Sequence, residues 1–287
     1  MAKILAIVVT FNAMPWIERF LGSLKKSSVE ADIFVIDNGS LDGTPEFVRE
    51  NWPEAIFFDS EENLGFGAAN NIGLKYAVEH GYEFVYLLNQ DAWLETDTLE
   101  KLLSAWKPSY GILSPVQMSG KGRRMDKRFA RKCKKYLKKD SVDPDVATVP
   151  FVMAAHWLIS RKALETVGGF SPAFKHYGED DNWIDRLHYF GYKVGVVRGA
   201  TAVHDRANRK PTEEQKMNLK CVATIVKISN PSHSFFGRHL VEPLELIGMS
   251  VKNLSLIPIR YIPELLKRYP ELKSLRKASK EKGAFLN

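Results

Sequence analysis

Short apolar runs alternate with segments of helical spacing along the N-terminal part of the chain, and this alternation constrains the fold more than any other feature. The apolar runs are rich in Val, Ile, Leu and Phe and occupy residues 3–9, 32–36, 55–58 and 83–88. Runs of this length and composition are typical of buried strands. Helix signals fill the intervals at residues 15–24, 45–51, 65–80 and 97–105. Strands and helices in alternation predict an α/β fold with a mostly parallel sheet covered by helices.

Polar residues directly follow three of the expected strands. These strand tips are Thr10-Phe11-Asn12, Asp37-Asn38-Gly39-Ser40 and Asn89-Gln90-Asp91. Ligands of parallel sheets bind beyond the carboxyl ends of the strands, where the buried strand fixes the backbone and the tip presents its side chains. We therefore expect a functional site at this edge of the sheet.

Two glycine-containing segments indicate a nucleotide pocket. Asp37, in VIDNGSLDGT at 35–44, can accept hydrogen bonds from ribose hydroxyls or from a pyrimidine imide N–H. Gly65 and Gly67, in NLGFGAANNIG at 63–73, come before a helix whose backbone N–H groups can meet a phosphate. Read singly, the first segment also suits an Asx-turn with a helix cap, and the second also suits a close-packed turn.

Asp91 and His204 are the candidate metal ligands. Asp91 follows a strand expected to be buried on both faces, and Mg²⁺ and Mn²⁺ take oxygen ligands beside substrate phosphates. The structural alternative for Asp91 is a helix N-cap before Leu94. His204 is expected after a strand at 192–197 and a turn of small residues. A neutral imidazole there can complete a metal site, or it can serve as a structural hydrogen-bonding group.

Three consecutive acids, Glu179, Asp180 and Asp181, stand at the start of a helix expected over 181–190. The helix dipole favours acids at this position, so helix capping alone explains one of them. Three in a row indicate that one carboxylate faces a site, where partial desolvation suits it to act as a general base toward a sugar hydroxyl. Arg186 follows on the same helix and is expected to pair with these acids.

Basic residues dominate residues 121–139, which hold eleven Lys and Arg. Such a segment suits a solvated helix or loop, or a surface that attracts a phosphorylated acceptor or an anionic membrane. From about residue 208 onward the sequence predicts helices with apolar and basic faces. Those helices suit peripheral membrane contact, packing on the core or a homodimer.

The composition of the whole chain narrows its partners and its compartment. A formal net charge of +7 over 287 residues favours an anionic partner such as a nucleotide, a phospholipid surface or nucleic acid. Cys133 and Cys221 lie far apart, which argues against a disulfide scaffold and fits a reducing compartment. No run approaches the ~20 apolar residues of a membrane span, and the N-terminal run is too short for a signal peptide. We therefore expect a cytoplasmic protein.

In their order and spacing, these motifs resemble the inverting family-2 glycosyltransferases, and within them the bacterial rhamnosyltransferases. The motifs are VVTFN, VIDNGSLDGT, NLGFGAANNIG, LLNQDAW, Gly168-Gly169-Phe170, YGEDDNWIDRLHYFGYK and a late His204. The resemblance covers residues 3 to about 205 and implies a GT-A fold, with a Rossmann-like mostly parallel sheet, flanking helices and a helical C-terminal extension. It divides the chain into a catalytic domain at 1–207 and a helical region at 208–287. The catalytic domain would hold the nucleotide-sugar at about 1–118 and the acceptor at about 140–207.

The resemblance also implies a role for individual residues. Asp180 matches the catalytic base and Glu179 the acid before it. Asp91 matches the last acid of the DXD motif, which binds Mg²⁺ or Mn²⁺ on the donor diphosphate, and His204 matches a histidine that ligates the metal in several members. Asn89 replaces the first acid of that motif, which leaves the metal open between Mg²⁺ and Mn²⁺. The implied nucleotide-binding residues are Thr10, Phe11, Asn12, Asp37, Asn38, Gly39, Asn63, Gly65, Phe66, Gly67, Asn70, Asn89 and Gln90.

The implied reaction is an in-line displacement that inverts the anomeric configuration of a hexose. The implied donor is dTDP-rhamnose or a UDP-sugar, and the implied acceptor is a cell-surface glycan or a lipid-linked sugar of cell-envelope polysaccharide synthesis. The enzyme would act in the cytoplasm or peripherally at the inner face of the plasma membrane. The main alternative is a non-catalytic protein that keeps the nucleotide site, and a nucleotidyltransferase and a nucleic-acid-binding protein follow it.

Overall fold

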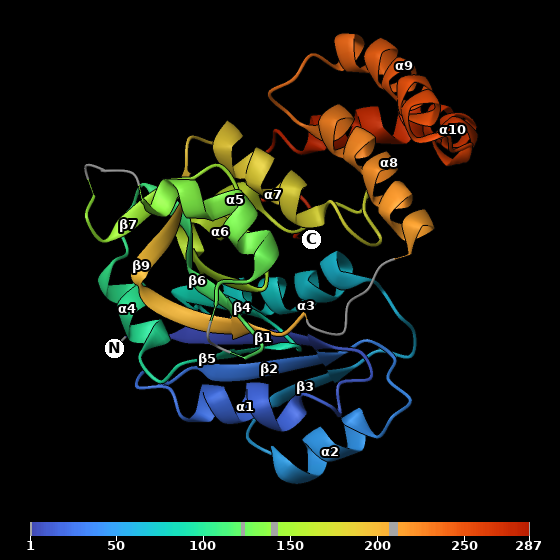
Figure 1. The fold of residues 1–287 in the computed structure, drawn as a ribbon. Coiled ribbons are helices and arrows are strands. Elements are labelled where there is room, and N and C mark those ends of the chain that lie inside the picture. The colour runs from blue at the N-terminus through green and yellow to red at the C-terminus, as the bar shows by residue number, and fades with distance from the viewer. Residues whose placement is uncertain (1, 122–123, 139–142, 207–211, 287) are drawn as a thin grey trace.

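The structure, a computed structural model, describes residues 2–121, 124–138, 143–206 and 212–286. Within these residues, nine strands form one mostly parallel sheet with helices on both faces (Figure 1). The strands are β1 (Ile4–Thr10), β2 (Asp32–Asp37), β3 (Ile56–Asp59), β4 (Phe84–Asn89), β5 (Ala92–Leu94), β6 (Tyr110–Ser119), β7 (Val146–Val149), β8 (His156–Ser160) and β9 (Lys193–His204). The helices are α1 (Ile17–Lys25), α2 (Thr44–Asn51), α3 (Phe66–Glu79), α4 (Thr98–Ser104), α5 (Lys127–Leu137), α6 (Arg161–Val167), α7 (Glu179–Tyr189), α8 (Glu213–Ser229), α9 (Phe235–Asn253) and α10 (Ile257–Ala278). The expected α/β fold is confirmed.

The strand order explains how the strand tips meet. The sheet runs β3-β2-β1-β4-β8-β6-β9-β5, and β7 pairs with β9. Strands β1 to β4 are mutually parallel, with Thr10 opposite Asp37 and Val9 opposite Asn89. Strand β8 is antiparallel to both β4 and β6, so it begins at the edge where β4 ends. The start of β8 therefore joins the tips of β1, β2 and β4 at one edge of the sheet.

Two apolar cores lie on opposite faces of the sheet, and the side chains of β1 alternate between them. Leu5 and Ile7 belong to the core that includes α3, α5, α6 and α7. Ile4, Ala6 and Val8 belong to the core that includes α1, α2 and α4. A strand covered on both faces must be apolar at its buried positions, which is why residues 4–9 form an unbroken apolar run.

The strands and helices expected up to residue 105 are confirmed to within one or two residues at most ends. Three details differ. Residues 92–94 form β5 by pairing with β9, so Asp91 does not cap a helix. Strand β9 continues through His204 because it resumes pairing with β6 after an irregularity opposite Pro115 and Val116, so no turn separates the strand from His204. Part of the basic segment forms helix α5, with Phe129 and Cys133 buried, while residues 122, 123 and 139 of that segment lie outside the described residues.

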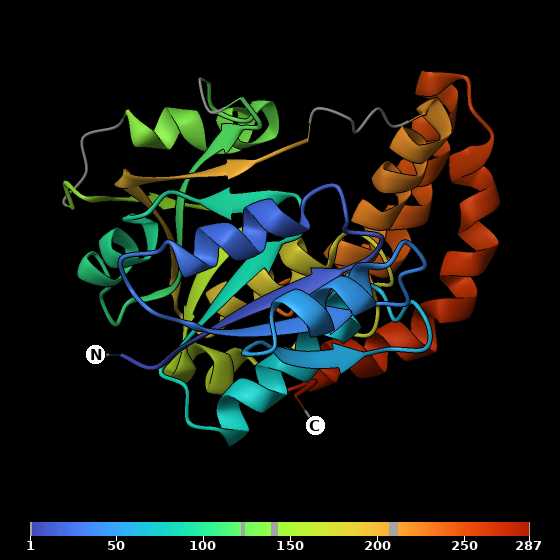
Figure 2. The same cartoon turned by 90° about the horizontal axis from the view of Figure 1, so that it is seen from below.

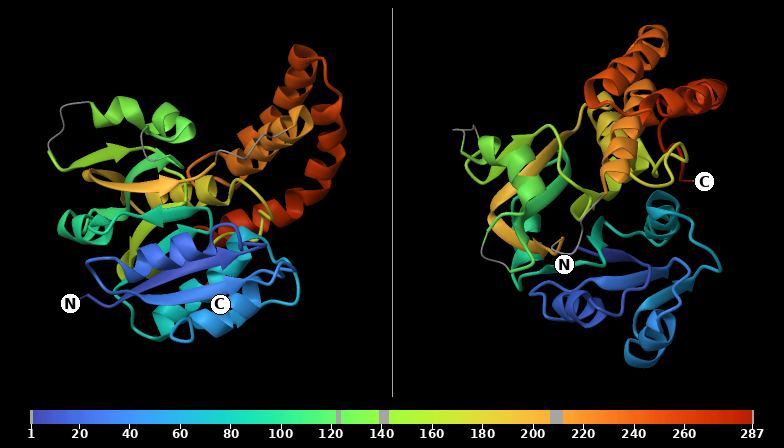
Figure 3. Two further views of the ribbon diagram at one scale, coloured as in Figure 1. Left: turned by 60° about the horizontal axis from the view of Figure 1, so that its bottom comes forward. Right: turned by 45° about the vertical axis from the view of Figure 1, so that its right-hand side comes forward.

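Helices α8, α9 and α10 lie together at one side of the α/β body (Figures 1, 2 and 3). They enclose a separate apolar cluster to which the body contributes Ala173 and Phe174. The expected domain boundary at 207/208 falls on residues outside those that the structure describes. Within the described part of the chain, every helix is too short or too polar to cross a bilayer.

The C-terminal segment returns to the α/β body and contacts a buried arginine. The backbone N–H of Gly169 donates to the carbonyl of Ala284 at 2.8 Å. Arg186 is fully buried and donates to the carbonyls of Gly169 at 2.5 Å, of Ala284 at 3.3 Å and of Val167. The expected pairing of Arg186 with the acids of its own helix is wrong, because its side chain lies on the buried face of α7 and carbonyl oxygens bind it there. Burial lowers the pKa of Arg186 to about 9.

Gly168 tests this docking of the C-terminal segment. It has a φ of +87°, and a Cβ atom there would overlap the backbone of Ala284, whereas Gly191 has a φ of +82° with open space around a Cβ atom. Both positions have a positive φ that penalises a side chain, and Gly168, with a ψ of −162°, lies in a region that essentially only glycine adopts. We expect Gly168→Ala to lower the free energy of unfolding by ~2 kcal/mol more than Gly191→Ala, because the C-terminal segment must move.

Urea denaturation of the two variants measures this difference. In chains that end at Lys282, the excess loss at Gly168 should shrink, because the overlap with Ala284 is gone and only the strain of the backbone conformation remains. Equal losses in the full chain would contradict the docking of the C-terminal segment.

Candidate functional site

The carboxylate of Asp37 organises the tips of β1 and β2. It is fully buried and accepts hydrogen bonds from Thr10 Oγ1 at 2.8 Å, from Ser40 Oγ at 2.7 Å and from the backbone N–H of Ser40 at 2.8 Å. Gly39 permits the turn between them with a φ of +82°. The carboxylate of Asp37 therefore stabilises the backbone conformation at the end of β2 through its hydrogen bonds to Thr10 and Ser40.

Neighbouring residues link this tip to that of β4. The side-chain amide of Gln90 accepts from the backbone N–H of Phe11 at 2.6 Å and donates to its carbonyl at 3.0 Å. Asn12 adopts a φ of 52° and accepts at its side-chain oxygen from the backbone N–H of Leu41 at 2.9 Å. Phe11 is 44% exposed, so this linked surface presents a partly free aromatic ring to solvent.

The glycine segment at 63–73 connects the β2 tip to the loop before α7. Asn38 donates to the side-chain oxygen of Asn63 at 3.0 Å, and the backbone N–H of Gly65 donates to the same oxygen at 3.0 Å. A Cβ atom on Gly65 would lie 2.5 Å from the carbonyl oxygen of Lys175. A Cβ atom on Gly67 would lie 3.8 Å from the Cβ atom of Glu179. Both glycines therefore allow close approach between the start of α3 and the loop that leads into the acids.

Phe66 and Asn70 lie further along this segment, in the first turns of α3. Asn70 is buried and donates to the carbonyl of Phe66 at 2.8 Å. The structure thus satisfies this amide within the helix.

Asp91 and His204 meet across the β5–β9 pair. The backbone N–H of Asp205 donates to the carbonyl of Asp91 at 2.8 Å, and His204 Nε2 lies 3.4 Å from Asp91 Oδ1. Both side chains are almost fully buried. Among the described residues, neither ring nitrogen of His204 has a hydrogen-bond partner, and the same holds for the buried side-chain oxygen of Asn89. Buried polar atoms without a hydrogen-bond partner cost free energy unless a ligand satisfies them.

His156 is part of this site and was not predicted from the sequence. It is fully buried, and burial lowers its pKa to about 3, so the imidazole is neutral. Its Nε2 lies 2.9 Å from the carbonyl oxygen of Val203, which can only accept, so the other nitrogen, Nδ1, accepts from the hydroxyl of Tyr86 at 2.8 Å. Residues 149–159 are otherwise apolar, and the single histidine among them was the signal from which this site residue could have been predicted.

The acids at the start of α7 occupy a desolvated environment. Glu179 is buried, and burial together with the neighbouring Asp180 raises its pKa to about 8. Burial also raises the pKa of Asp180, which is half-buried, and of Asp181. Perturbed carboxyl groups of this kind cluster at functional sites.

Arg128 of α5 opposes these shifts. Its charge lowers the pKa of Glu179, Asp180 and Asp181, against the larger effect of burial. Helix α5 is held in place by buried Phe129 and by an N-cap in which Asp126 accepts from the backbone N–H of Phe129 at 2.9 Å. Part of the basic segment therefore faces the acids instead of solvent.

A short segment before β8 joins the two halves of the site. The backbone N–H of Ala154 hydrogen-bonds Asp180 and lowers its pKa. The carbonyl of the next residue, Ala155, accepts from the backbone N–H of Asn89 at 3.1 Å. His156 follows and adjoins Asp91 and His204, whose charges both influence its pKa. The structure therefore brings Asp91 and Asp180 to one place, although they are far apart in sequence.

Comparison with known proteins decides the family. The model of Glycosyl transferase family 2 matches residues 5–168, more than half of the chain. The chain is a family-2 glycosyltransferase. The resemblance read from the motifs is confirmed, and so is the activity class that it implied.

Relatives of this glycosyltransferase include bacterial sugar transferases. It is 26% identical over 240 residues to the N-acetylglucosaminyl-diphospho-decaprenol L-rhamnosyltransferase of Mycobacterium tuberculosis, across 72% of this chain and 78% of the relative. It is 24% identical over 121 residues to the undecaprenyl-phosphate mannosyltransferase of Micrococcus luteus, across 41% of this chain and 50% of that protein.

Solved structures confirm the GT-A fold of the glycosyltransferase. TarS of S. aureus, in complex with UDP, matches with a TM-score of 0.59 and 17% identity, covering 82% of this chain and 68% of that one. The mannosyltransferase PcManGT of Pyrobaculum calidifontis, in complex with GDP-Man and Mn²⁺, matches with a TM-score of 0.57 and 19% identity, covering 96% and 84%.

Replacing Arg128 tests the electrostatics of the acids. Arg128→Met removes a charge that lowers the carboxyl pKa values, so the base will need a higher pH to ionise. We expect the acidic limb of the profile of kcat/KM against pH to move up by about one pH unit. Lys134→Met, on an exposed position of the same helix, is the matched control and should leave the limb in place. A wild-type limb in both variants would rule out this role of Arg128.

Proposed function

We propose that this glycosyltransferase moves a sugar from a nucleoside-diphosphate donor to a hydroxyl of a cell-envelope glycan or lipid-linked acceptor. Rhamnose is the favoured sugar, and the reaction inverts its anomeric configuration. The convergence of Asp91 and Asp180 on the segment Ala154–His156 carries the proposal. It gives one site both a cation-binding side and a basic side. The relative from M. tuberculosis, a rhamnosyltransferase whose name contains a diphospho-decaprenol sugar, supports rhamnose and a lipid-linked acceptor.

The proposed donor is dTDP-rhamnose or a UDP-sugar, bound at the strand tips. Structural neighbours in complex with UDP, UDP-GlcNAc and GDP-Man support a nucleotide-sugar donor. Phe11 and Asn12 are exposed at these tips and are free to contact a nucleotide. Asp37 would contribute to binding of the base or ribose mainly by keeping the end of β2 in its binding conformation.

The donor atoms around Asp91 fit a divalent cation. The unpartnered ring nitrogens of His204 lie beside a buried carboxylate, and the amide oxygen of Asn89, at the end of β4, is also buried without a hydrogen-bond partner. No group of three or more His, Cys, Asp and Glu suitable for a metal occurs in the described residues, so phosphate oxygens of the donor would complete the coordination. We propose that Asp91 and His204 hold Mg²⁺ or Mn²⁺, which when bound would neutralise charge on the leaving diphosphate.

Asp180 is the proposed general base. Its carboxylate would take the proton of the acceptor hydroxyl as that oxygen attacks the anomeric carbon on the side opposite the leaving nucleoside diphosphate. The N–H of Ala154 and the charge of Arg128 both favour the ionised form that this step needs. Glu179, with a pKa of about 8, is largely protonated at neutral pH, so it does not add a second full negative charge beside the base.

The proposal places the enzyme in the cytoplasm or peripherally at the inner face of the plasma membrane, where a lipid-linked acceptor would be reached. The division into a catalytic domain at 1–207 and a helical region at 208–287 is part of the same proposal. Instead of contacting a membrane, the apolar faces of the C-terminal helices could pair in a homodimer.

Asp180→Asn is the direct test of the base. The amide cannot take a proton, so we expect kcat for sugar transfer to fall by about 10²–10⁴-fold while the Kd of the donor nucleotide stays within a few-fold. Asp181→Asn is the matched control on the same helix turn, and it should retain most of the activity. Near-normal turnover of Asp180→Asn would remove the assignment. A wild-type protein that binds donor but never transfers or hydrolyses it would favour the non-catalytic alternative.

Asp91→Ala tests the cation side of the site. A thermal-shift panel of dTDP, UDP and GDP, each with and without Mn²⁺, reads base and metal preference together because a ligand of the folded state raises Tm. We expect the wild type to gain several degrees with Mn²⁺ and its preferred nucleotide, and Asp91→Ala to lose the Mn²⁺-dependent part. Asp145→Ala, an exposed carboxylate elsewhere, is the control. An unchanged Mn²⁺ response in Asp91→Ala would contradict the metal role.

A further inference from the structure

Helix α9 exposes a continuous row of apolar side chains, here called the apolar stripe. Its members are Phe236, Leu240, Leu244, Ile247, Val251 and Leu254, with exposed fractions from 44% at Ile247 to 95% at Leu254. The spacing of three and four residues places the first five on one face of α9, and Leu254, the C-cap residue, follows directly after the helix. The opposite face holds Glu242, Leu246 and Ser250, which are buried against α8 and α10. The stripe is therefore the face of α9 that the protein itself leaves uncovered.

The position of α9 leaves the stripe accessible. Helix α9 stands at the periphery, away from the sheet (Figures 1 and 3), while α10 leads back toward the α/β body. Contiguous exposed apolar surface of this kind marks an interaction site in soluble proteins.

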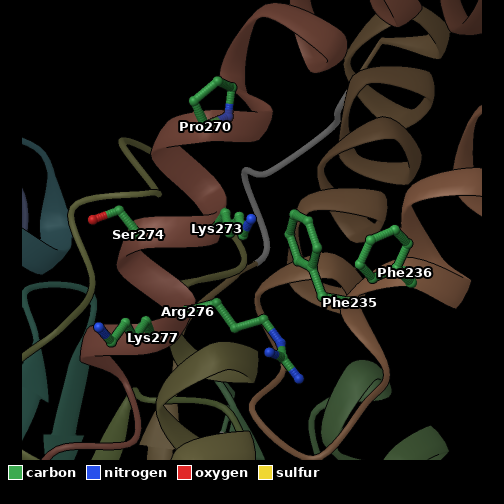
Figure 4. A pocket seen from close by; sticks show the side chains of 7 residues that line it. All are labelled: Phe235, Phe236, Pro270, Lys273, Ser274, Arg276 and Lys277. Carbon is green, nitrogen blue, oxygen red and sulfur yellow. The ribbon is translucent and has the colours of Figure 1, made fainter.

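A cavity with a cationic rim adjoins the N-terminal end of the stripe (Figure 4). It measures about 450 Å³, and Phe235 and Phe236 form its apolar side. Lys273 and Lys277 of α10 line the same cavity, are exposed and form no ion pair among the described residues. Figure 4 shows Lys273 beside Phe235, with Lys277 further along α10. An apolar ring beside an ammonium group suits an anionic amphiphile, with an acyl segment against the rings and a phosphate at the lysine.

The other end of the stripe is also cationic. Lys252 and Arg260 flank the bend between α9 and α10 and are exposed. The two acids of α9 do not offset them, because Glu242 pairs with Lys227 and Arg238, and Glu245 also pairs with Lys227. The uncompensated charge near the stripe is therefore positive at both ends.

This charge pattern distinguishes the two occupants that an apolar stripe could have. In an antiparallel pair of copies, the lysines near Phe236 of one copy would face Lys252 and Arg260 of the other. In a parallel pair, identical cationic ends would meet. Either arrangement places like charges together, whereas an anionic bilayer complements both ends at once.

We propose that the apolar stripe lies in the interface of an anionic lipid bilayer, with Lys273 and Lys277 contacting phosphate headgroups. Helix α8 connects this surface to the site, because a Cβ atom on Gly178, the N-cap of α7, would lie 2.9 Å from Val226 of α8. A chain docked in this way holds its acids next to a membrane-bound acceptor. That consequence rests on the proposed function, but the docking itself does not.

Vesicle flotation of the full chain tests the proposal without any donor or acceptor. We expect flotation with vesicles of phosphatidylcholine plus phosphatidylglycerol, and little with phosphatidylcholine alone. Leu240→Gln with Leu244→Gln should weaken binding about tenfold or more, because both side chains leave the apolar phase. Lys273→Gln and Lys277→Gln should each weaken binding to the anionic vesicles about fivefold. All four positions are exposed, so the variants should fold.

Phe58→Gln with Leu41→Gln is the matched control, since both positions are exposed and apolar but lie in the α/β body, away from the stripe and α10. It should float like the wild type. Absence of flotation on anionic vesicles, or flotation that the stripe variants do not reduce, overturns the proposal. A dimer in light scattering that Leu240→Gln with Leu244→Gln dissociates, without flotation, assigns the stripe to a second copy instead. Because flotation needs no turnover, a failed transfer assay leaves its result unaffected.

Discussion

The antiparallel insertion of β8 between β4 and β6 is the constraint on which the site depends. A parallel strand in that position would begin at the opposite edge of the sheet. Because β8 is antiparallel, the residues that lead into it lie at the edge where β4 ends, and three consecutive backbone units make three different contacts there. The backbone N–H of Ala154 interacts with Asp180, and the carbonyl of Ala155 accepts from the backbone N–H of Asn89. His156 adjoins Asp91 and His204. One short segment thereby fixes the spacing between the proposed cation ligands and the proposed base.

The electrostatics of the site follow from this packing. Desolvation raises the pKa of all three carboxyl groups at the start of α7, which disfavours the ionised form that the proposed base needs. Arg128 and the N–H of Ala154 act in the opposite direction. The neutral state of His156 matters in the same way, because a buried imidazolium beside His204 would repel a cation. The protein thus keeps one side of the site suited to a cation and the other suited to proton transfer.

The sequence predicted the strands, their tips and the acids because these depend on local patterns, namely unbroken apolar runs and helical spacing, and on residue type. Asp91, Asp180 and His204 were predicted as site residues through their place at the ends of such patterns. His156, Arg128 and the role of Ala154 were missed because they depend on pairing between distant strands, and no local signal encodes the order β4-β8-β6. Arg186 was misread for a similar reason. Helical spacing predicted that it lies near the acids, but its side chain instead donates to the carbonyls of Val167, Gly169 and Ala284.

Helix α7 has supports from the C-terminal region on two sides. Val226 of α8 packs against its N-cap at Gly178, and Ala284 and Phe285 cover Arg186, with the guanidinium 4.8 Å from the ring centre. A chain cut near residue 207 would lose both supports and leave the buried guanidinium without one of its acceptors. Removing the helices would therefore disturb the acids themselves, so loss of activity in such a truncation would say little about membranes. Point substitutions on the outer face of α9 avoid this coupling, because the face that holds α9 against α8 and α10 is the opposite one.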